Sequence, residues 1–229
     1  MTDDTEVPAP SAAPLPAPMT VAQIMEAESV ALARAPEDVL MDRAARAVAR
    51  VVRVELAKAG KPVPNAHIVV LAGSGRNGGD ALLAGALLAA DGADVTGVEV
   101  AVTAHTRGRL ALDAAGGRPL SAVAESGIRA ADAVLAEADL VIDGIAGLGG
   151  SAGLRAPADH LVGKIPADAI VVSVDLPSGL NADSGEVTGT YVKASVTVAF
   201  TAPTWCLVTA PASQAAGRIV VADVGVDVV

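Results

Sequence analysis

Residues 69–83 read Val69-Val-Leu-Ala-Gly-Ser-Gly-Arg-Asn-Gly-Gly-Asp-Ala-Leu-Leu83 and indicate the type of fold. Four apolar residues lead into a glycine cluster, and a run rich in alanine and leucine follows directly. This order predicts a strand, a tight loop over residues 73–80 and a helix. Glycine lets backbone N–H groups approach a ligand, and a helix N-terminus adds partial positive charge. An anion-binding or nucleotide-binding turn is the first hypothesis, and a purely structural turn is the alternative.

The loop lacks one phosphate-binding fingerprint and contains another. No Gly-Lys-Ser/Thr follows the glycines, so the loop is not a Walker A motif. Residues Gly73 to Gly78 do match the Gly-x-Gly-x-x-Gly of dinucleotide-binding folds, and Glu99 stands where an acid would bind ribose. An NAD-dependent dehydrogenase is therefore one rival interpretation. The lack of a separate substrate domain with a catalytic His or Lys argues against it.

Composition narrows the class of protein. The 229 residues suit one α/β domain, and with 52% hydrophobic but only 1% aromatic residues, Ala, Val and Leu must fill the core. A net charge of −10 argues against a nucleic-acid-binding surface. Cys206 is the single cysteine, which excludes an intrachain disulfide and a thiolate metal cage, and the three histidines show no metal-ligand spacing.

The two ends of the chain differ in character. Residues 1–18 are acidic and then rich in Pro and Ala, which predicts a disordered tail before a domain over residues 19–229. No signal-peptide pattern is visible, and the longest apolar run, residues 81–90, is too short to cross a bilayer. We therefore expect no membrane partner and a cytoplasmic location.

Alternating elements predict an α/β fold. Thr20-Val-Ala-Gln23 resembles a capping box that opens a helix to about residue 35, and a second helix with an apolar stripe is expected over residues 36–59. Further helices are expected over residues 80–90 and 128–137, with a short one at 109–115. The fold class is a three-layer α/β/α, Rossmann-like, doubly wound domain with a largely parallel sheet. Its strands are predicted at residues 67–72, 94–102, 140–145, 170–176, 195–200 and 218–224.

Polar residues follow three of these strands. Besides the glycine loop, Asp143 ends one strand and Asp175-Leu-Pro-Ser178 ends another. Either motif alone is equally explained by a helix N-cap or a turn. In a parallel sheet, however, the carboxyl ends of the strands share one rim, so Asn77, Asp80, Asp143, Asp175 and Ser178 should converge there. Their oxygen donors favour a hard cation such as K⁺, Na⁺ or Mg²⁺ over zinc.

Three motifs in order carry a family resemblance. They are Gly73-Ser-Gly-Arg-Asn-Gly-Gly-Asp80, Asp143-Gly-Ile-Ala-Gly-Leu-Gly149 and Asp175-Leu-Pro-Ser-Gly-Leu-Asn-Ala-Asp-Ser-Gly185. With these motifs the chain resembles the NAD(P)H-hydrate epimerases, the YjeF N-terminal domain family, from about residue 20 to the C-terminus. It departs from the family pattern at four positions: Arg76, Ala81, Leu148 and Thr204.

The resemblance implies an isomerase that repairs nicotinamide coenzymes by interconverting the R and S epimers of NADHX and NADPHX. It implies one K⁺ per subunit, held by Asn77, Asp143 and Ser178. It also implies substrate contacts along two loops and at the third strand end, from Arg76, Asn77, Gly78, Gly79, Asp80, Gly147, Leu148, Gly149, Gly150, Ser151, Ala152, Gly153 and Asp175.

The chemistry of the implied reaction needs an acid–base group. Inverting a carbinolamine carbon requires either reversible loss of its hydroxyl or ring opening and reclosure, and both move protons. A carboxylate suits that role, and Asp175 is our candidate catalytic residue, with Asp80 next. The family further implies a homodimer and an NAD(P)HX dehydratase partner, which a longer protein would carry beyond Val229. The remaining alternative is a non-catalytic nucleotide-binding or scaffold domain of the same fold.

Overall fold

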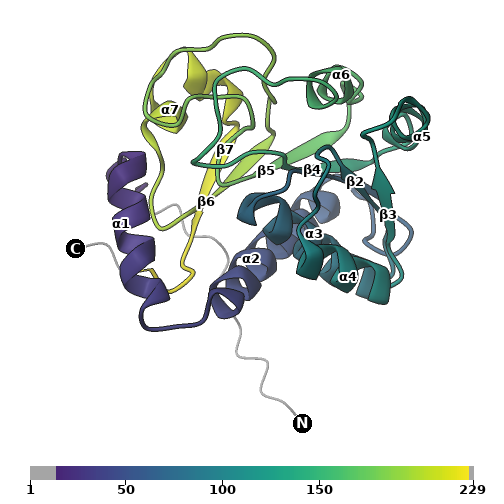
Figure 1. The fold of residues 1–229 in the computed structure, drawn as a ribbon, viewed down its shortest axis with the longest axis horizontal. Helices are drawn as coiled ribbons and strands as arrows, with labels where there is room; N and C mark the ends of the chain where they lie inside the picture. Colours follow the sequence, from purple (N-terminus) through teal and green to yellow (C-terminus); the bar gives the residue numbers. More distant parts are fainter. Residues whose placement is uncertain (1–13, 227–229) are drawn as a thin grey trace.

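The computed structural model describes residues 14–226, and it confirms the predicted three-layer α/β/α fold (Figure 1). Most of the predicted disordered tail, residues 1–13, lies outside the described residues. All pairings in the seven-stranded sheet are parallel, in the order β3-β2-β1-β4-β5-β6-β7. The strands are β1 His67–Ala72, β2 Asp94–Glu99, β3 Arg118–Ser121, β4 Leu140–Gly144, β5 Ile170–Val174, β6 Val196–Phe200 and β7 Arg218–Ala222.

The strand order reverses between β1 and β4. From β1 the chain builds outward to β3, and it then returns to β4 on the other side of β1. In doubly wound sheets this reversal opens a crevice outside the carboxyl ends of the two central strands. The fold therefore places its ligand crevice beside the glycine-rich β1–α3 turn.

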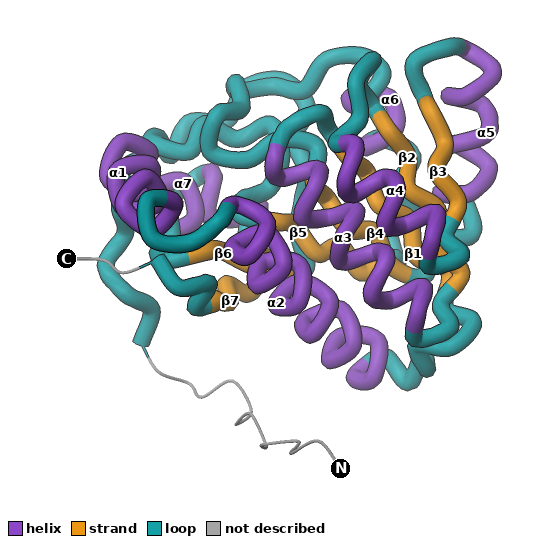
Figure 2. Tube along the Cα trace, turned by 60° about the horizontal axis from the view of Figure 1, so that its bottom comes forward, coloured by secondary structure: helices purple, strands orange, loops and turns teal. Residues whose placement is uncertain are grey.

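Helices cover both faces of the sheet (Figures 1 and 2). One layer holds α2 and α3, with α4 against α3, and the other holds α5 and α6. α1 stands at the β6 side of the molecule, near α7 (Figure 1). The helices are α1 Val21–Leu32, α2 Glu37–Lys58, α3 Arg76–Ala90, α4 Thr106–Ala114, α5 Glu125–Leu135, α6 Ala158–Val162 and α7 Trp205–Val208, and a 3₁₀ turn η1 covers Ala212–Ala215. No helix within residues 14–226 is long and apolar enough to cross a membrane.

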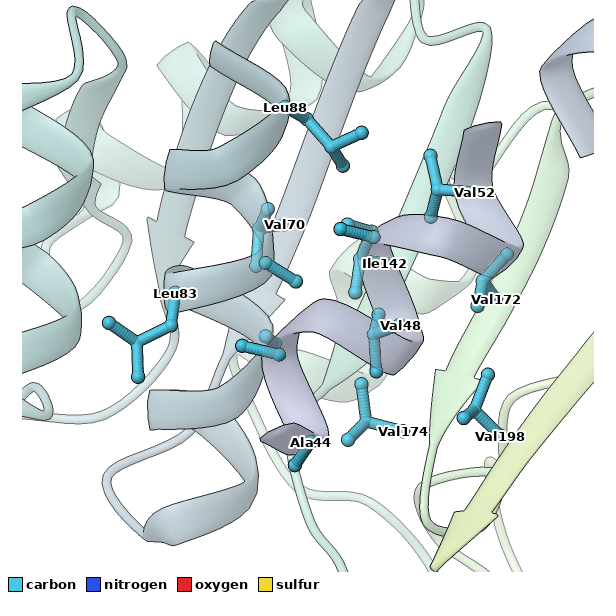
Figure 3. Packing of buried hydrophobic residues seen from close by; sticks show 14 of the residues in the cluster. Ala44, Val48, Val52, Val70, Leu83, Leu88, Ile142, Val172, Val174 and Val198 are labelled. Atoms are coloured by element: carbon cyan, nitrogen blue, oxygen red, sulfur yellow. The ribbon is translucent and has the colours of Figure 1, made fainter. Parts of the chain in front are cut away.

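Local signals fix the first two helices where the sequence predicts them. Thr20 caps α1, since its hydroxyl accepts from the backbone N–H of Gln23 and its own N–H donates to the Gln23 side chain. This is the expected capping box. α2 then lays its apolar stripe on the sheet: Ala44, Val48 and Val52 face the strand residues Val70, Ile142, Val172, Val174 and Val198 (Figure 3).

Alternation along the strands divides the core between the two faces. In β1, Val70 packs toward α2 and α3, whereas Val69 and Leu71 pack toward α5 and α6. β4 and β5 repeat this pattern, because successive side chains of a strand point to opposite faces. Strands buried on both faces explain why their sequences are apolar throughout.

Two local predictions were wrong. The glycine loop was expected to run to Asp80, yet α3 begins at Arg76, so Asn77 and Asp80 lie in its first turn and a half. Glycine disfavours a helix by about 1 kcal/mol, but here close packing overrides that preference: a Cβ at Gly79 would lie 2.6 Å from the Met41 methyl carbon. The strand β3 was not predicted, because it is a half-exposed edge strand that contains Pro119.

Candidate active site

A cavity of about 430 Å³ lies at the carboxyl ends of β1, β4 and β5, where the strand order reverses. Its polar side comes from the start of α3, the β4–α6 loop and the end of β5. Its other side comes from α1, α2, β6 and the C-terminal segment and is apolar except for Glu28 and Glu37. The lining residues are Glu28, Leu32, Glu37, Leu40, Met41, Ala44, Ser74, Gly75, Arg76, Asn77, Asp80, Ile145, Ala146, Gly147, Leu148, Gly149, Gly150, Asp175, Phe200, Val224 and Val226.

Asp143 and Ser178 form a buried polar cluster that does not line the cavity. Both are fully buried, and the Ser178 hydroxyl donates to Asp143 Oδ1 at 2.6 Å. The other Asp143 oxygen accepts from the Ser173 hydroxyl at 2.8 Å and from the backbone N–H of Ser178 at 2.9 Å. Ser178 Oγ also accepts from the backbone N–H of Ala146, which ties the β5 turn to the β4–α6 loop. The cluster thus fixes the two loops that border the cavity.

Asp175 ends β5 in a strained backbone conformation and points into the cavity wall. Its φ of 70° lies in the left-handed region that non-glycine residues rarely adopt. The backbone N–H of Leu148 donates to Asp175 Oδ2 at 3.1 Å. A Cβ built at Gly147 would lie 3.0 Å from that oxygen and 3.2 Å from Asn77 Oδ1. Because Gly147 has no side chain, the Asp175 and Asn77 side chains can both approach this position.

Two polar groups on the first turns of α3 lack partners. Asp80 is 8% exposed, and its Oδ1 atom accepts no hydrogen bond within the described chain; the buried Asn77 Nδ2 atom likewise has no acceptor. Unpaired buried polar atoms are costly, so native proteins keep few of them outside functional sites. Both residues line the cavity, which marks its polar side as the place where a ligand would complete the hydrogen bonding.

Burial raises the pKa values of both cavity carboxyls toward neutrality. It raises the pKa of Asp80 to about 8, and the charge of Asp175 adds to the rise. Burial also raises the pKa of Asp175 to about 7, and the carboxylate of Glu28 raises it further, while the Leu148 N–H and Arg76 oppose the rise. A carboxyl whose pKa lies near 7 can both give and take a proton at neutral pH. Such shifted groups in a cavity are typical of active sites.

Arg76 lies at the mouth of this acidic site between two helices. Its guanidinium is 3.4 Å from Glu28 on α1 and 3.8 Å from Glu37 on α2, and its side chain is half exposed. Burial raises the pKa of Glu28, and Arg76 opposes that rise. The loose contacts leave the guanidinium free to meet an anionic ligand at the start of α3.

The structure brings together most, but not all, of the residues expected at the site. Arg76, Asn77, Asp80, Gly147, Leu148, Gly149, Gly150 and Asp175 line the cavity. Gly78, Gly79, Ser151, Ala152 and Gly153 do not line it, and their contacts with substrate stay predictions. The expected meeting of Asn77, Asp80, Asp143, Asp175 and Ser178 at one rim occurs in two layers, with Asp143 and Ser178 beneath the cavity wall.

Sequence reasoning missed the acidic and apolar parts of the wall. Glu28 and Glu37 were not candidates, although Glu28 lies within the helix that the capping box predicts. Phe200 and Val224 were placed only on strands or at their ends. Of the four departures from the family pattern, Arg76 and Leu148 line the cavity, whereas Ala81 and Thr204 are buried away from it.

The buried cluster contains oxygen donors of the kind that a hard cation takes as ligands. Asp143 accepts hydrogen bonds only from uncharged groups in the described chain, and its burial raises its pKa. A cation beside Asp143 would compensate for that burial. The backbone oxygen of Asn77 lies 2.9 Å from the Cβ position of Gly144, the residue after Asp143, so the start of α3 adjoins the end of β4. Carboxylate, amide and hydroxyl oxygens together suit a hard ion.

Fold and site together define a doubly wound α/β domain with an acid-lined ligand cavity at its topological switch point. The sequence profile described as "YjeF-related protein N-terminus" matches residues 37–206. The chain belongs to this YjeF-related N-terminal family.

Its relatives include single-domain and bifunctional proteins. It is 38% identical over 215 residues to the NAD(P)H-hydrate epimerase of Clavibacter sepedonicus, covering 90% of this chain and 89% of the relative. It is 37% identical over 209 residues to the bifunctional NAD(P)H-hydrate repair enzyme Nnr of Mycobacterium tuberculosis, covering 91% of this chain but 41% of the relative. The chain thus spans between about one third and two fifths of the length of the bifunctional relatives that it matches.

A solved structure supports the fold. The crystal structure of yeast ynu0 (YNL200c) superposes with a TM-score of 0.72 at 21% sequence identity, covering 86% of each chain. At this identity the likeness concerns the fold alone.

Proposed function

We propose that this chain is an NAD(P)H-hydrate epimerase that interconverts the R and S epimers of NADHX and NADPHX. The observation that carries the proposal is the pair of cavity carboxyls, Asp175 and Asp80, with pKa values raised to about 7 and about 8. Relatives that bear this name support the substrate class. Both carboxyls lie at the polar side of a cavity that also has an apolar wall for a ring.

Asp175 suits either route by which the hydroxyl-bearing ring carbon C6 can invert. In the first, the C6–O bond breaks as the ring nitrogen forms a C=N bond, and a protonated carboxyl gives its proton to the leaving hydroxyl to release water. Water then adds to the other face and returns a proton to a carboxylate. In the second, the C6–N bond breaks as the hydroxyl proton passes to a carboxylate and the ring nitrogen receives a proton, which gives an aldehyde. The C5–C6 bond then rotates, the nitrogen adds to the other face of the aldehyde, and the two proton transfers are reversed. Neither route changes the oxidation state.

Proton transfer near pH 7 is what both routes ask of the protein. Asp175 is our general acid–base, because its oxygen is held by the Leu148 N–H at the cavity wall. Asp80 is the second carboxyl of the cavity, and at neutral pH its raised pKa keeps it largely protonated as a hydrogen-bond donor. Arg76 and the N-terminus of α3 would bind the phosphate groups.

We propose K⁺ as the resident ion, held by Asn77, Asp143 and Ser178. The uncharged surroundings of the buried Asp143 carboxylate support this assignment. The ion would neutralise that carboxylate and hold the two loops in place. It has no part in the proton transfers, which Asp175 supplies.

Two partners belong to the proposal. An NAD(P)HX dehydratase would consume the S epimer. The bifunctional relatives, of which this chain matches between about one third and two fifths, support fusion of the two activities in one protein. A second copy of the chain, in a homodimer, stays a prediction from the family. A cytoplasmic location stays a prediction from the sequence.

The decisive assay uses purified protein with chromatographically separated R-NADHX and S-NADHX. Each epimer alone should convert to the same equilibrium mixture, faster than its spontaneous epimerisation and without forming NADH or NAD⁺. Heat-denatured protein is the control for the spontaneous rate. The same test applies to the NADPHX epimers.

A non-catalytic nucleotide-binding domain is the second candidate, and the assay separates the two. The strained Asp175 and the unpartnered Asp80 oxygen favour an enzyme, because a scaffold gains nothing from keeping them. If neither epimer is converted while the hydrate still raises the melting temperature of the protein, the epimerase proposal is wrong and the binding domain is favoured.

A further inference from the structure

The glycine fingerprint of the β1–α3 turn packs mainly against the protein itself. A Cβ at Gly73 would lie 2.0 Å from the carbonyl oxygen of Ile145, and one at Gly78 would lie 2.1 Å from the carbonyl oxygen of Gly73. Of the three fingerprint glycines, only Gly75 has open space at its Cβ position, and it alone lines the cavity. The turn therefore offers one small anion position beside Arg76 rather than a long cradle for a diphosphate.

The acid that would hold the ribose of an adenosine half is buried outside the cavity. In dinucleotide-binding folds this acid ends the second strand. Here Glu99 ends β2, is 5% exposed and does not line the cavity. Its Oε1 lies at an ion-pair distance of 3.4 Å from Nε of Arg109 on α4, although it accepts no hydrogen bond within the described residues. Within residues 14–226 the cavity wall thus does not reach the position of an adenosine ribose.

The size of the cavity also favours binding of one half of the dinucleotide. A whole hydrated dinucleotide has roughly 45 non-hydrogen atoms and would fill about 700 Å³ at the packing density of protein interiors, whereas its nicotinamide mononucleotide half would fill about 350 Å³. The cavity measures about 430 Å³. Because the cavity opens to solvent, it has room for the mononucleotide half, and a longer ligand would extend beyond its mouth.

The residues of the cavity wall indicate which half of the dinucleotide binds in the cavity. The reacting ring must reach Asp175, and Leu40, Met41 and Phe200 provide apolar surface in the same cavity. Gly75 and Arg76 stand at the start of α3 for the phosphate attached to the ribose of that ring. One ring, one ribose and one phosphate account for the cavity.

We propose that the cavity binds only the hydrated nicotinamide mononucleotide half, leaves the adenosine half outside, and therefore also epimerises the free hydrate of reduced nicotinamide mononucleotide. This inference rests on the proposed function and defines its substrate class. The step is the same inversion at C6, with water and protons balanced as above, and it needs no oxidant or reductant.

The first experiment compares the hydrates of NADH and of reduced nicotinamide mononucleotide on the purified protein. The inference predicts kcat/KM values within about tenfold of each other, because the atoms that differ lie outside the cavity. Rapid conversion of NADHX with conversion of the mononucleotide hydrate slower by about a thousandfold or more would overturn this inference while leaving the proposed function intact. Conversion of neither hydrate would instead contradict the proposed function.

The second experiment reads binding without catalysis, so the inference stays testable in every case. Nicotinamide mononucleotide should raise the melting temperature of the protein, and adenosine monophosphate at the same concentration should not. An equal or larger rise with adenosine monophosphate would overturn the inference. Glu99→Gln is the matched variant: its kcat/KM for NADHX should stay within about twofold of wild type, whereas an adenosine-binding Glu99 predicts a rise in KM of tenfold or more.

Discussion

Buried acids have different surroundings at two places on the same sheet. One place is the carboxyl ends of β1, β4 and β5, and the other is the carboxyl end of β2. At the first, Asp80 and Asp175 are buried in a cavity, and their pKa values rise to about 8 and about 7. At the second, Glu99 is as deeply buried but lies 3.4 Å from the Arg109 guanidinium. Glu99 thus has a guanidinium within ion-pair distance, whereas Asp80 and Asp175 line a cavity with raised pKa values, which indicates chemistry.

The largest effect should come from Asp175→Asn. This change keeps the size and the hydrogen bond from the Leu148 N–H but removes the exchangeable proton. We expect kcat for NADHX epimerisation to fall by about 10²–10⁴, as is usual for loss of a general acid–base. Chromatography of the epimers measures it, and circular dichroism checks the fold. If KM rises while kcat is unchanged, Asp175 binds substrate only, and Asp80 becomes the candidate acid–base.

Removal of K⁺ should have the next largest effect. Dialysis into a buffer with a large organic cation should raise KM about tenfold by loosening the two loops, and added K⁺ should restore it. Asp143→Ala should raise KM more than Ser178→Ala, because it removes the charge and leaves the donors of Ser173 and Ser178 unpaired. A KM that does not depend on K⁺ in the wild type would rule out the ion.

Asp80→Asn should make the protein more stable at alkaline pH. The folded-state pKa of about 8 exceeds the ordinary value of 3.8, so folding favours the protonated form, and stability falls as the pH rises from about 4 to about 8. The variant lacks this loss. Its gain in unfolding free energy over wild type, from urea titrations, should grow from pH 5 to pH 8 and reach at least about 1 kcal/mol. A gain that is equal at both pH values would contradict the raised pKa.

The smallest effects should be opposite shifts of the pH–rate profile from two neighbours of Asp175. Glu28 raises the pKa of Asp175 and Arg76 lowers it. Glu28→Gln should therefore move the limb of kcat/KM that reports Asp175 to lower pH, and Arg76→Asn should move it to higher pH. Shifts in the same direction would mean that the two variants act on structure rather than through charge.

The sequence predicts the fold well because its signals are local. Capping at Thr20, the apolar stripe of α2 and the fully apolar strands follow from neighbouring residues, and the structure confirms them. The start of α3 at Arg76 could not be predicted in this way, because glycine disfavours helix. Only the close approach of Met41 and His105 to Gly79 shows why glycine stands at that position.

The site is predictable in its polar half and not in its apolar half. Asp143, Asp175 and the glycine turn could be predicted, because polar residues that follow apolar strands of a parallel sheet lie at the edge where ligands bind. Glu28, Phe200 and Val224 reach the same cavity from segments far apart in the chain. Nothing in their local sequence distinguishes them from ordinary helix or strand residues, so only the packed fold reveals them.

The most direct test of the contrast between the two strand ends is the kcat/KM for conversion of R-NADHX to S-NADHX by Asp175→Asn and Glu99→Gln, measured side by side with wild type. The account predicts a fall of about 10²–10⁴ for Asp175→Asn and a value within about twofold of wild type for Glu99→Gln. An active Asp175→Asn beside an inactive but folded Glu99→Gln would contradict it, and would move the reaction to the end of β2.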